Sequence, residues 1–387
     1  MNHINYFSEK EIDLLTKAKK NKEYLHLKNN SNKDRSIIKL KEVNNLISMH
    51  NAWNIKNFKL VLDRKPINFS QFCTEGADMG FTSILPDPIK VQDFIKKGAS
   101  LVLDDIIYLS NEIKTFAKDL QKITLGKCEA NLYLSMKSHQ AFGPHFDTHD
   151  VFALHCDGEK VWNIYEALED NPINHPIFKS NVEERAKKAG KIIEKVVMKP
   201  GDLLYIPRGK FHDALASKSG AIHIAFGINY MKPIDIIQLI WNELITNSYL
   251  RSDIRSVNGT DDIEKINKKI ISELKIIFEN KSFFDPILQE YNNWPYNLID
   301  YDLENIVKGG VYYAVSKSVS LSYKEGNMFL IDGKNRVEVP KNFEKMTKFS
   351  FEQQNISIEI LKNNFPNNSD NDISEFVDAM KNMSVFY

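Results

Sequence analysis

The chain has 387 residues, which is too long for one ordinary domain and sufficient for two or three. Lys plus Arg and Asp plus Glu number 51 each, so the net charge gives no case for nucleic-acid binding. Hydrophobic residues make up 42% of the chain and charged residues 26%, as in ordinary globular proteins. The composition therefore indicates a folded protein of more than one domain.

The cysteines and the beginning of the sequence bear on the cellular compartment. Cys73, Cys128 and Cys156 are odd in number and widely spaced, which argues against a disulfide framework and for a reducing environment. The residues Met1–Lys10 lack the apolar core of a signal peptide, and the sequence contains no run of about 18 apolar residues. We therefore expect a cytoplasmic protein without a membrane span.

The first third of the chain indicates a helical leader followed by mixed structure. Residues 1–50 are rich in Lys, Asn and Glu, and they predict a helix over Glu9–Lys20. From Trp53 to Ser135 the pattern predicts helices over Val91–Lys97 and Asn111–Leu120, together with strands that lead into the central segment. The leader is expected to cover the part that follows.

The central segment alternates apolar strands with turn residues. Val151–Cys156 and Val161–Tyr165 flank Asp157 and Gly158, a dipeptide typical of hairpin turns. Val196–Pro200 and Leu203–Ile206 lie on either side of a Pro-Gly-Asp turn. This succession predicts a double-stranded β-helix, the jelly-roll or cupin architecture, as the mainly β core of an α+β protein.

His145, Asp147 and His212 form a candidate set of metal ligands. Successive side chains on a strand point to opposite faces, so His145 and Asp147 would project from the same face. His212 follows 65 residues after Asp147, just beyond the interruption Pro207–Gly209. Two imidazoles and one carboxylate on one side of an ion leave its other positions open, as a non-haem Fe(II) oxygenase requires. A solvated surface pair is the alternative, since His-x-Asp on its own is more often that.

Beyond the central segment the pattern becomes helical and then mixed. After Pro233, apolar residues recur at helical spacing, and a further helix is predicted over Asp262–Glu279. The apolar stripe after Pro233 consists of Ile236, Ile237, Ile240, Trp241, Leu244 and Ile245. The last part of the chain predicts strands over Asn327–Ile331 and Arg336–Val339 and helices over Glu352–Leu361 and Asp372–Met380.

Five stretches of the sequence resemble the JmjC-type cupins. These stretches are Ala130–Ser135, Gly143–Asp147, Asp150–Phe152, Gly158–Trp162 and Pro200–His212. Within the JmjC-type cupins, the chain is most similar to the ribosomal oxygenases, which are Fe(II)- and 2-oxoglutarate-dependent protein hydroxylases. The resemblance runs from about Phe72 to Tyr230. One fold can host different reactions, so a metal-retaining cupin of other chemistry is the alternative.

The resemblance implies a role for each ligand and for one lysine. His145, Asp147 and His212 would bind Fe(II) as the catalytic centre, and O₂ would take an open position on the metal. The co-substrate 2-oxoglutarate would chelate the metal and present its distal carboxylate to Lys160, whose ammonium is a point-charge partner. An exposed lysine on a hairpin is the alternative interpretation of Lys160.

Further co-substrate contacts are implied on two strands. Asn131 and Tyr133 match family positions that hydrogen-bond 2-oxoglutarate, and polar residues at a strand edge are the alternative. Where relatives carry Ser or Thr on the last strand, this chain has Ala225 and Gly227, which leaves part of the co-substrate site undefined. His223 lies on that strand and is a candidate to line the pocket.

The changes of pattern along the chain divide it into four segments, two of which the resemblance interprets. They are a helical leader (1–50), the JmjC catalytic domain (51–232), a helical segment (233–308) and a C-terminal winged-helix-like domain (309–387). The helical segment would form a homodimer, and packing against its own barrel is the alternative. The last domain would be a winged helix by shape only, because it carries no strong basic stripe for nucleic acid.

The implied reaction is hydroxylation of a side chain in a protein substrate, such as an arginine or a histidine of a ribosomal protein. Demethylation of N-methyl-lysine uses the same core and is one alternative. Hydroxylation of a free amino acid, or of a peptide in a biosynthetic pathway, is a second. A cupin that only binds a partner is the non-enzymatic alternative.

Overall fold

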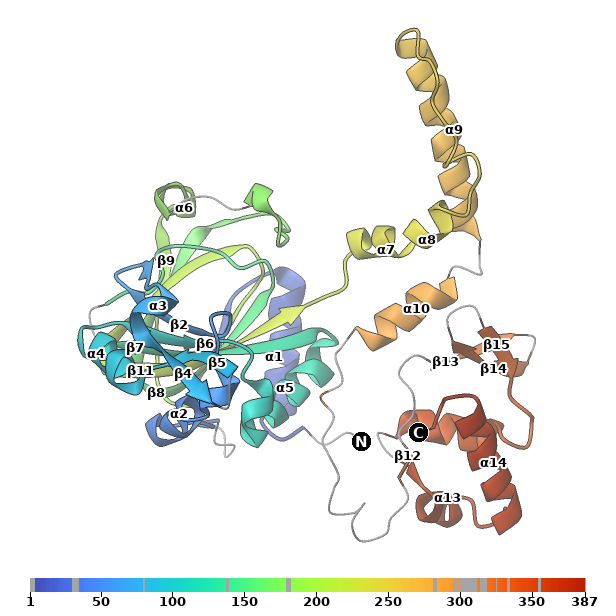
Figure 1. Cartoon of the computed structure of the whole chain (residues 1–387), viewed down its shortest axis with the longest axis horizontal. Helices are drawn as coiled ribbons and strands as arrows, with labels where there is room; N and C mark the ends of the chain where they lie inside the picture. Colours follow the sequence, from blue (N-terminus) through green and yellow to red (C-terminus); the bar gives the residue numbers. More distant parts are fainter. Residues whose placement is uncertain are drawn as a thin grey trace. The chain divides into compact units, whose positions relative to one another are not determined.

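The structure is a computed structural model with mixed α and β architecture (Figure 1). It describes residues 4–29, 35–78, 81–136, 139–178, 182–280, 284–294, 298, 312–313, 319–324, 326–332, 335–353 and 356–386. The chain divides into two compact units, Met1–Tyr230 and Met231–Tyr387. Within the described ranges, none of the helices combines the length and the apolar character needed to span a membrane. The finer division into four segments stays a prediction.

The first unit is built on one large antiparallel sheet (Figure 1). Over the described residues its strands follow the order β1-β10-β8-β11-β7-β6-β2-β3, and β9 pairs with β8. The strands are β1 (Leu25–Leu27), β2 (Phe58–Leu62), β3 (Lys65–Pro66), β6 (Ser100–Leu103), β7 (Lys127–Met136), β8 (Asp150–Leu168), β9 (Ile192–Met198), β10 (Leu203–Ile206) and β11 (Lys210–Asn229). A separate antiparallel pair consists of β4 (Cys73–Asp78) and β5 (Phe81–Pro86). This sheet confirms the predicted β core of an α+β protein.

The helices of the first unit confirm the three predicted from periodicity, which are α1 (Glu9–Asn21), α4 (Pro88–Lys96) and α5 (Asn111–Thr124). The remaining helical elements are α2 (Leu40–Ile47), α3 (Phe69–Phe72), α6 (Val182–Ala189) and the 3₁₀ turns His50–Ala52, Ile107–Leu109 and Pro176–Phe178. The Phe116 ring of α5 lies 4.8 Å from the Phe226 ring of β11. Helix α5 therefore packs on the sheet, where it shields apolar side chains of β11 from water.

The N-terminal residues are tied into the sheet. Strand β1 pairs with β10, with Leu25 opposite Tyr205. The Arg35 side chain is fully buried and donates hydrogen bonds to Glu11 Oε1 at 2.7 Å and to the Gly201 carbonyl at 3.0 Å. Because a charged side chain is rarely buried without partners, these contacts fix the N-terminal segment to the turn before β10.

The predicted hairpin at Asp157 and Gly158 is wrong. Strand β8 continues through both residues, and both halves of β8 pair with β11, with Phe152 opposite Phe226 and Val161 opposite Leu215. Gly158 has a φ of +71°, and the register between the two strands shifts beside it. Asp-Gly supplies the positive φ of a tight turn, but a β-bulge uses the same backbone freedom. Here the dipeptide bends one long strand.

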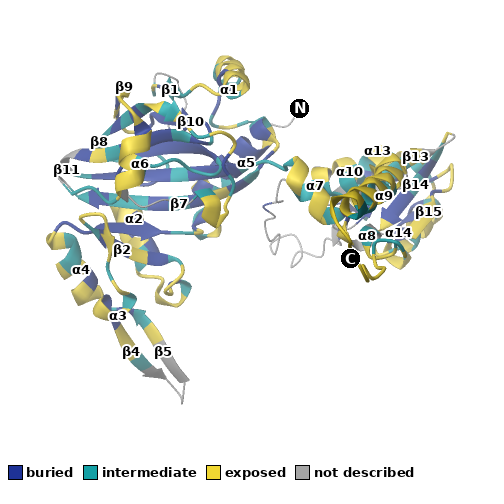
Figure 2. Ribbon diagram, turned by 90° about the horizontal axis from the view of Figure 1, so that it is seen from above, coloured by how far each residue is buried: buried dark blue, intermediate teal, exposed yellow. Residues whose placement is uncertain are grey.

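An apolar cluster lies on one face of the strands β8, β9 and β10. Its buried members are Val151, Ala153, Trp162, Ile164, Val196, Met198, Leu204 and Ile206. They come from β8, β9 and β10, so the middle of the sheet is held together by side chains of strands that are distant in sequence. Figure 2 shows these central strands as largely buried.

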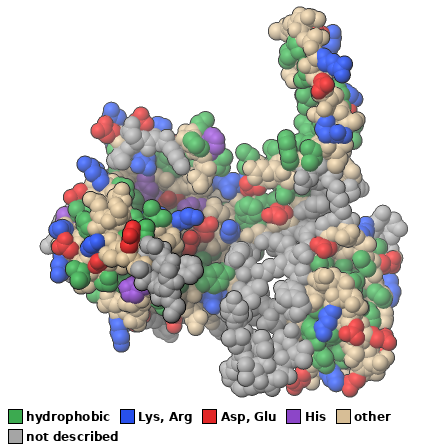
Figure 3. Space-filling model, viewed as in Figure 1, with side chains coloured by type: hydrophobic (Ala, Val, Ile, Leu, Met, Phe, Trp, Pro, Cys, Tyr) green, Lys and Arg blue, Asp and Glu red, His purple; other side chains and the backbone are tan. Residues whose placement is uncertain are grey.

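The second unit begins with helices that leave many apolar side chains exposed. They are α7 (Pro233–Leu239), α8 (Trp241–Leu244), α9 (Thr260–Glu279) and α10 (Phe284–Asn293). The predicted stripe after Pro233 is thus divided between α7 and α8, while the helix predicted over Asp262–Glu279 is confirmed by α9. No residue of α9 is buried. Figure 3 shows apolar side chains on its surface among Lys, Asp and Glu.

The rest of the second unit combines short strands and helices. The strands are β12 (Tyr312–Tyr313), β13 (Val319–Lys324), β14 (Asn327–Asp332), β15 (Asn335–Glu338) and β16 (Ile356–Ser357), and the helices are α12 (Glu344–Glu352), α13 (Ile358–Asn364) and α14 (Asp370–Asn382). The two predicted strands and the last helix are confirmed, and Gly333, between those strands in the sequence, lies outside the described residues. The helix predicted over Glu352–Leu361 is wrong, because Ile356 pairs with Tyr313 and the Ser357 hydroxyl caps a new helix.

Candidate metal centre and co-substrate pocket

A two-residue bridge places the first histidine opposite the second. The His145 amide donates to the His212 carbonyl at 3.0 Å, and the His212 amide donates to the His145 carbonyl at 2.8 Å. The prediction that His145 and Asp147 lie on one regular strand is wrong, because this isolated bridge is the ladder contact of an otherwise irregular stretch between the described ends of β7 and β8. Two backbone hydrogen bonds nevertheless fix His145 beside the start of β11.

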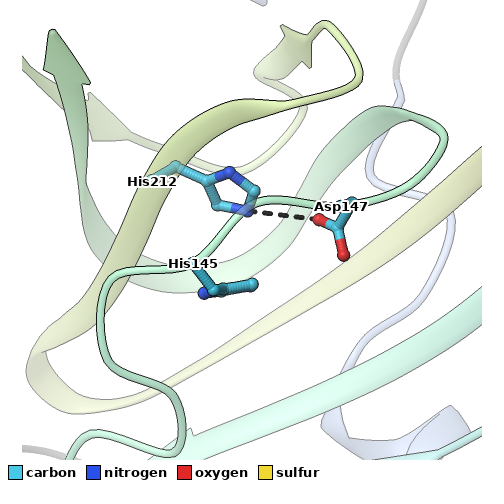
Figure 4. Close-up of side chains that lie close together, drawn as sticks. All are labelled: His145, Asp147 and His212. Carbon is cyan, nitrogen blue, oxygen red and sulfur yellow. Dashed lines mark ion pairs between the residues drawn. The ribbon is translucent and has the colours of Figure 1, made fainter. Parts of the chain in front are cut away.

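His145, Asp147 and His212 converge as predicted from their spacing. One ligand atom from each lies within 4.8 Å of the others. His212 Nε2 is 3.4 Å from Asp147 Oδ2, and the two imidazole centroids are 4.5 Å apart (Figure 4). His212 is buried, whereas His145 and Asp147 are half-buried, so the set is open on one side. Two imidazoles and a carboxylate in this arrangement fit a divalent first-row metal with open positions.

Backbone carbonyls orient both imidazoles. His145 Nδ1 lies 2.8 Å from the Gly143 carbonyl, and His212 Nδ1 lies 3.0 Å from the Lys210 carbonyl. A carbonyl oxygen only accepts, so each Nδ1 carries a hydrogen, and Nε2 is the ring nitrogen left to face the other side chains of the set. Outer hydrogen bonds of this kind select the tautomer and ring orientation of metal-binding histidines.

The electrostatics of the three residues suit a metal ligand set. Removal from water lowers the pKa of His145 to about 4, and the neighbouring His212 contributes to that shift. Burial alone would raise the pKa of Asp147, but the hydrogen bond with His212 and the two imidazoles outweigh it and hold that pKa well below its usual range. Burial likewise opposes protonation of His212, but Asp147 raises its pKa. The carboxylate is therefore ionised, and His145 is neutral, near pH 7.

A cavity of about 260 Å³ extends from the triad between β7, β8 and β11. Strand β7 contributes every second residue to its wall, because alternate side chains of a strand point to the same face. These residues are Glu129, Asn131, Tyr133 and Ser135. Strand β8 contributes Val151, Lys160 and Trp162, and β11 contributes His212, Ala214, His223, Ala225 and Gly227.

The residues predicted to hold 2-oxoglutarate lie in this cavity together with the triad. Lys160 is only 5% exposed, which excludes the surface-lysine alternative. Burial, with no acidic group to offset it, lowers the pKa of Lys160 to about 7. Asn131 Oδ1 accepts a hydrogen bond from the Asp105 amide at 3.2 Å, and the Tyr133 ring stacks on His223 at 4.7 Å.

Several residues near the site make contacts that the sequence did not reveal. Arg208, the arginine just before the start of β11, donates to Asn171 Oδ1 at 2.9 Å and is absent from the cavity wall. Ser135 lies in the cavity, and the alternation Asn131, Tyr133, Ser135 could have indicated it. His149 packs its ring over Gly227, where a Cβ atom would lie 2.7 Å from the imidazole.

Comparisons with known proteins agree with this geometry. Residues 106–235 match the family model described as the JmjC domain. The "Bifunctional lysine-specific demethylase and histidyl-hydroxylase NO66" of Drosophila willistoni is 32% identical over 143 residues, which are 36% of this chain and 18% of that protein. "Ribosomal oxygenase 1" of Gallus gallus is 32% identical over 127 residues, which are 33% of this chain and 21% of that protein. The match thus spans about one fifth of these curated relatives.

Solved structures share the fold over nearly the whole chain. YcfD, a ribosomal oxygenase from Escherichia coli in complex with cobalt and 2-oxoglutarate, matches with a TM-score of 0.56 and 14% identity over 99% of both chains. YcfD in complex with cobalt and succinic acid matches with a TM-score of 0.53 and 14% identity over 94% of both chains. Residues 106–235 of the chain are therefore similar to the JmjC domain. The chain as a whole shares the fold of the YcfD structures.

Proposed function

We propose that this chain is an Fe(II)- and 2-oxoglutarate-dependent oxygenase that hydroxylates a side chain of a protein substrate. The observation that carries the proposal is the convergence of His145, Asp147 and His212 in a cavity that also holds a buried lysine. A metal-free binding module has no need of two imidazoles and an ionised carboxylate aimed at one point.

The metal would be held by His145 Nε2, His212 Nε2 and an Asp147 carboxylate oxygen. Both histidines already have Nδ1 engaged with carbonyl groups, so Nε2 is the nitrogen available to a metal, which would replace any proton that His212 shares with Asp147. When bound, Fe(II) would supply the oxidative decarboxylation of 2-oxoglutarate with O₂ and the hydroxylation of the substrate. The protein would orient both molecules and keep water from the reacting groups.

Lys160 would bind the distal carboxylate of 2-oxoglutarate, and Asn131 and Tyr133 would orient the co-substrate between Lys160 and the metal. The placement of all three on the cavity wall supports these roles. A buried ammonium without an acidic partner is destabilised, as its lowered pKa indicates, and a carboxylate ligand would compensate it.

The substrate side chain would be cationic. Glu129 lies on the same face of β7 as Ser135, six residues away, so the cavity has a carboxylate toward one end and a lysine toward the other. A positively charged group would be attracted to the Glu129 end and repelled from Lys160. An arginine or histidine of a ribosomal protein fits this polarity, and the names histidyl-hydroxylase and ribosomal oxygenase among the relatives support the histidine. N-methyl-lysine fits it as well and remains the second candidate.

The second unit would serve assembly. Exposed Ile237, Trp241 and Ile271 support a homodimer formed through α7, α8 and α9, because exposed apolar side chains on successive helices are stabilised by a second copy. The three-stranded sheet β13-β14-β15 with α12, α13 and α14 would be a winged-helix-like domain. The site is proposed to operate in the cytoplasm, on a protein or peptide.

Mass spectrometry tests the function and separates the two reactions. Ribosomal proteins from cells with and without the enzyme are compared, and the purified protein is then incubated with Fe(II), 2-oxoglutarate and the candidate peptide. We expect the peptide to gain the mass of one oxygen atom with matched succinate formation. Loss of a methyl group would identify a demethylase instead. No succinate with any peptide, and none without, would contradict an oxygenase.

A further inference from the structure

Two neutral side chains hold the buried ammonium of Lys160. Lys160 Nζ donates to Ser135 Oγ at 2.9 Å and to His223 Nδ1 at 3.4 Å. All three residues are at most 5% exposed. They come from β7, β8 and β11, so the cluster depends on the pairing of three strands in the correct register.

The His223 ring is itself held in a fixed orientation. It stacks on the Tyr133 ring at 4.7 Å with an interplanar angle of 12°, and the Trp162 ring meets it edge-on at 5.3 Å and 88°. Because Lys160 has only hydrogens to offer, His223 Nδ1 must carry a lone pair, and the hydrogen is on Nε2. Burial keeps the pKa of His223 well below its usual value, so the ring stays neutral and able to accept.

In its protonated form, Lys160 keeps one donor and a positive charge that the cluster does not neutralise. An ammonium has three N–H groups, and Ser135 and His223 account for two of them. Neither acceptor is charged, and among the described residues no carboxylate forms an ion pair with Lys160. The Ser135 hydroxyl, which accepts from Lys160, still has its own hydrogen to donate. Two donors and one positive charge therefore face the cavity together, which is the complement of a carboxylate.

We propose that His223 is a positioning residue that fixes the Lys160 ammonium for the distal carboxylate of the co-substrate, with Ser135 as a second donor to that carboxylate. This inference rests on the proposed function and deepens it. It also accounts for Ala225 and Gly227, where relatives were expected to carry a hydroxyl. In this chain the hydroxyl is supplied by β7, and β11 supplies the imidazole that aims the lysine.

Two substitutions of His223 separate positioning from packing. His223→Phe keeps a flat ring between Tyr133 and Trp162 but removes the acceptor. His223→Asn loses the ring but keeps an acceptor near the position of Nδ1. If His223 acts by positioning Lys160, His223→Phe should weaken 2-oxoglutarate binding about tenfold and His223→Asn should retain most of the affinity. A purely structural role predicts the reverse order.

Calorimetric titration of the full chain in the presence of Mn(II) supplies the binding constants without turnover. Oxalate chelates a metal but has no distal carboxylate, so its affinity should be the same in the wild type and in His223→Phe. In turnover assays, the KM for 2-oxoglutarate should rise with little change in kcat. His26→Phe, a histidine of β1 that contacts Asp202 and lies outside the cavity wall, is the control and should leave both affinities unchanged.

The outcomes distinguish this inference from the proposed function. A wild-type protein that neither binds nor consumes 2-oxoglutarate would contradict both the proposed function and the positioning role of His223. A wild type that binds 2-oxoglutarate, with equal affinity in His223→Phe, overturns the positioning role alone. If His223→Phe does not fold, Ser135→Ala and Ser135→Thr decide the matter. The alanine variant should lose about tenfold in affinity and the threonine variant should recover it, whereas equal affinities would refute the cluster.

Discussion

The first unit buries titratable side chains, and the second exposes apolar ones. Lys160, His212 and His223 are at most 5% exposed, and each has a hydrogen-bond partner. In contrast, Ile237 is 56% exposed, and Trp241 and Ile271 are each 64% exposed. Burying a polar group requires compensating partners, and exposing a large apolar group forfeits the gain from removing it from water. The buried charged groups of the first unit indicate that a ligand binds there. The exposed apolar groups of the second unit indicate that another surface covers them.

The missing partners differ in kind. In the cavity, the groups open to a ligand are imidazole nitrogens, a lysine amine and a carboxylate, which a metal ion and small charged molecules bind. On α7, α8 and α9 the unpaired surface is apolar, which only another protein surface covers well. Substitutions in the cavity should therefore affect ligand binding, and substitutions on α7 and α8 should affect assembly.

The largest effect is expected at the metal ligands. His145→Ala or His212→Ala should abolish 2-oxoglutarate turnover, because one imidazole and the carboxylate no longer retain Fe(II). Circular dichroism should still report a folded sheet, since the apolar cluster of β8, β9 and β10 is untouched. The measurement is succinate formation with Fe(II) in excess. Full turnover in both variants would contradict the ligand assignment.

The second prediction concerns the exposed stripe. Ile237→Glu combined with Trp241→Glu would bury charges at a closed two-fold interface and should convert a dimer into monomers. These two positions are suitable because both are exposed, whereas Ile240 is buried. Light scattering gives the mass. The control is Ile89→Glu on α4, an exposed isoleucine of the first unit.

A monomeric wild-type chain would show that the exposed apolar side chains do not form a homodimer interface. The exposed side chains of α7 and α8 would then require a different partner. An unchanged dimer mass in the double variant would move the interface away from α7 and α8.

The sequence predicted the ligand set better than the backbone that carries it. His145, Asp147 and His212 were identified because a metal restricts the residue types of its ligands and because each ligand stands in a short recognisable stretch of sequence. The bridge between His145 and His212 is a contact between residues 67 positions apart (212 minus 145), and no local pattern encodes it. Regular alternation therefore suggested a strand, whereas tertiary pairing produced an irregular segment.

The same limit explains the error at Gly158 and the omission of Ser135. Asp157 and Gly158 permit a positive φ, but only the pairing with β11 decides between a turn and a bulge. Ser135 ends the JmjC-like stretch Ala130–Ser135, yet its contact with Lys160 depends on the register of three strands. Helices α1 and α5, in contrast, were predicted because caps and periodicity are properties of adjacent residues.

Lys160 provides the third prediction. Loss of a charge-assisted contact costs about 1.5 to 3 kcal/mol, and each 1.4 kcal/mol is about tenfold in affinity. Lys160→Ala should therefore raise the apparent 2-oxoglutarate requirement by about one to two orders of magnitude, with metal affinity little changed. Lys160→Arg should rescue only partly, because its planar fork differs from a point ammonium.

Arg208→Ala is the control for that series, since its guanidinium contacts Asn171 outside the cavity wall. Titration of 2-oxoglutarate against succinate formation gives the requirement. An unchanged value in Lys160→Ala together with a large loss in Arg208→Ala would transfer the carboxylate anchor to Arg208.

The smallest effect is a pH dependence that follows from the same lysine. Its pKa is about 7 in the folded protein, against an ordinary value of 10.5, because burial disfavours the charged form. Between these pH values the unfolded chain holds a proton that the folded chain lacks, so this residue makes stability rise with pH. The contribution is at most about 1.4 kcal/mol per pH unit. His155 and His223, which face Lys160, have lowered pKa values and stay neutral in this range.

Lys160→Met should therefore stabilise the empty protein more at pH 6 than at pH 9, as measured by urea denaturation at each pH. A carboxylate beside the ammonium raises its pKa again, so 2-oxoglutarate binding at pH 8 should take up close to one proton in the wild type and none in Lys160→Met. Calorimetry in buffers of different ionisation enthalpy counts these protons. Zero uptake in the wild type would mean that Lys160 is already charged in the empty cavity, and its burial would then have to be compensated by the protein alone.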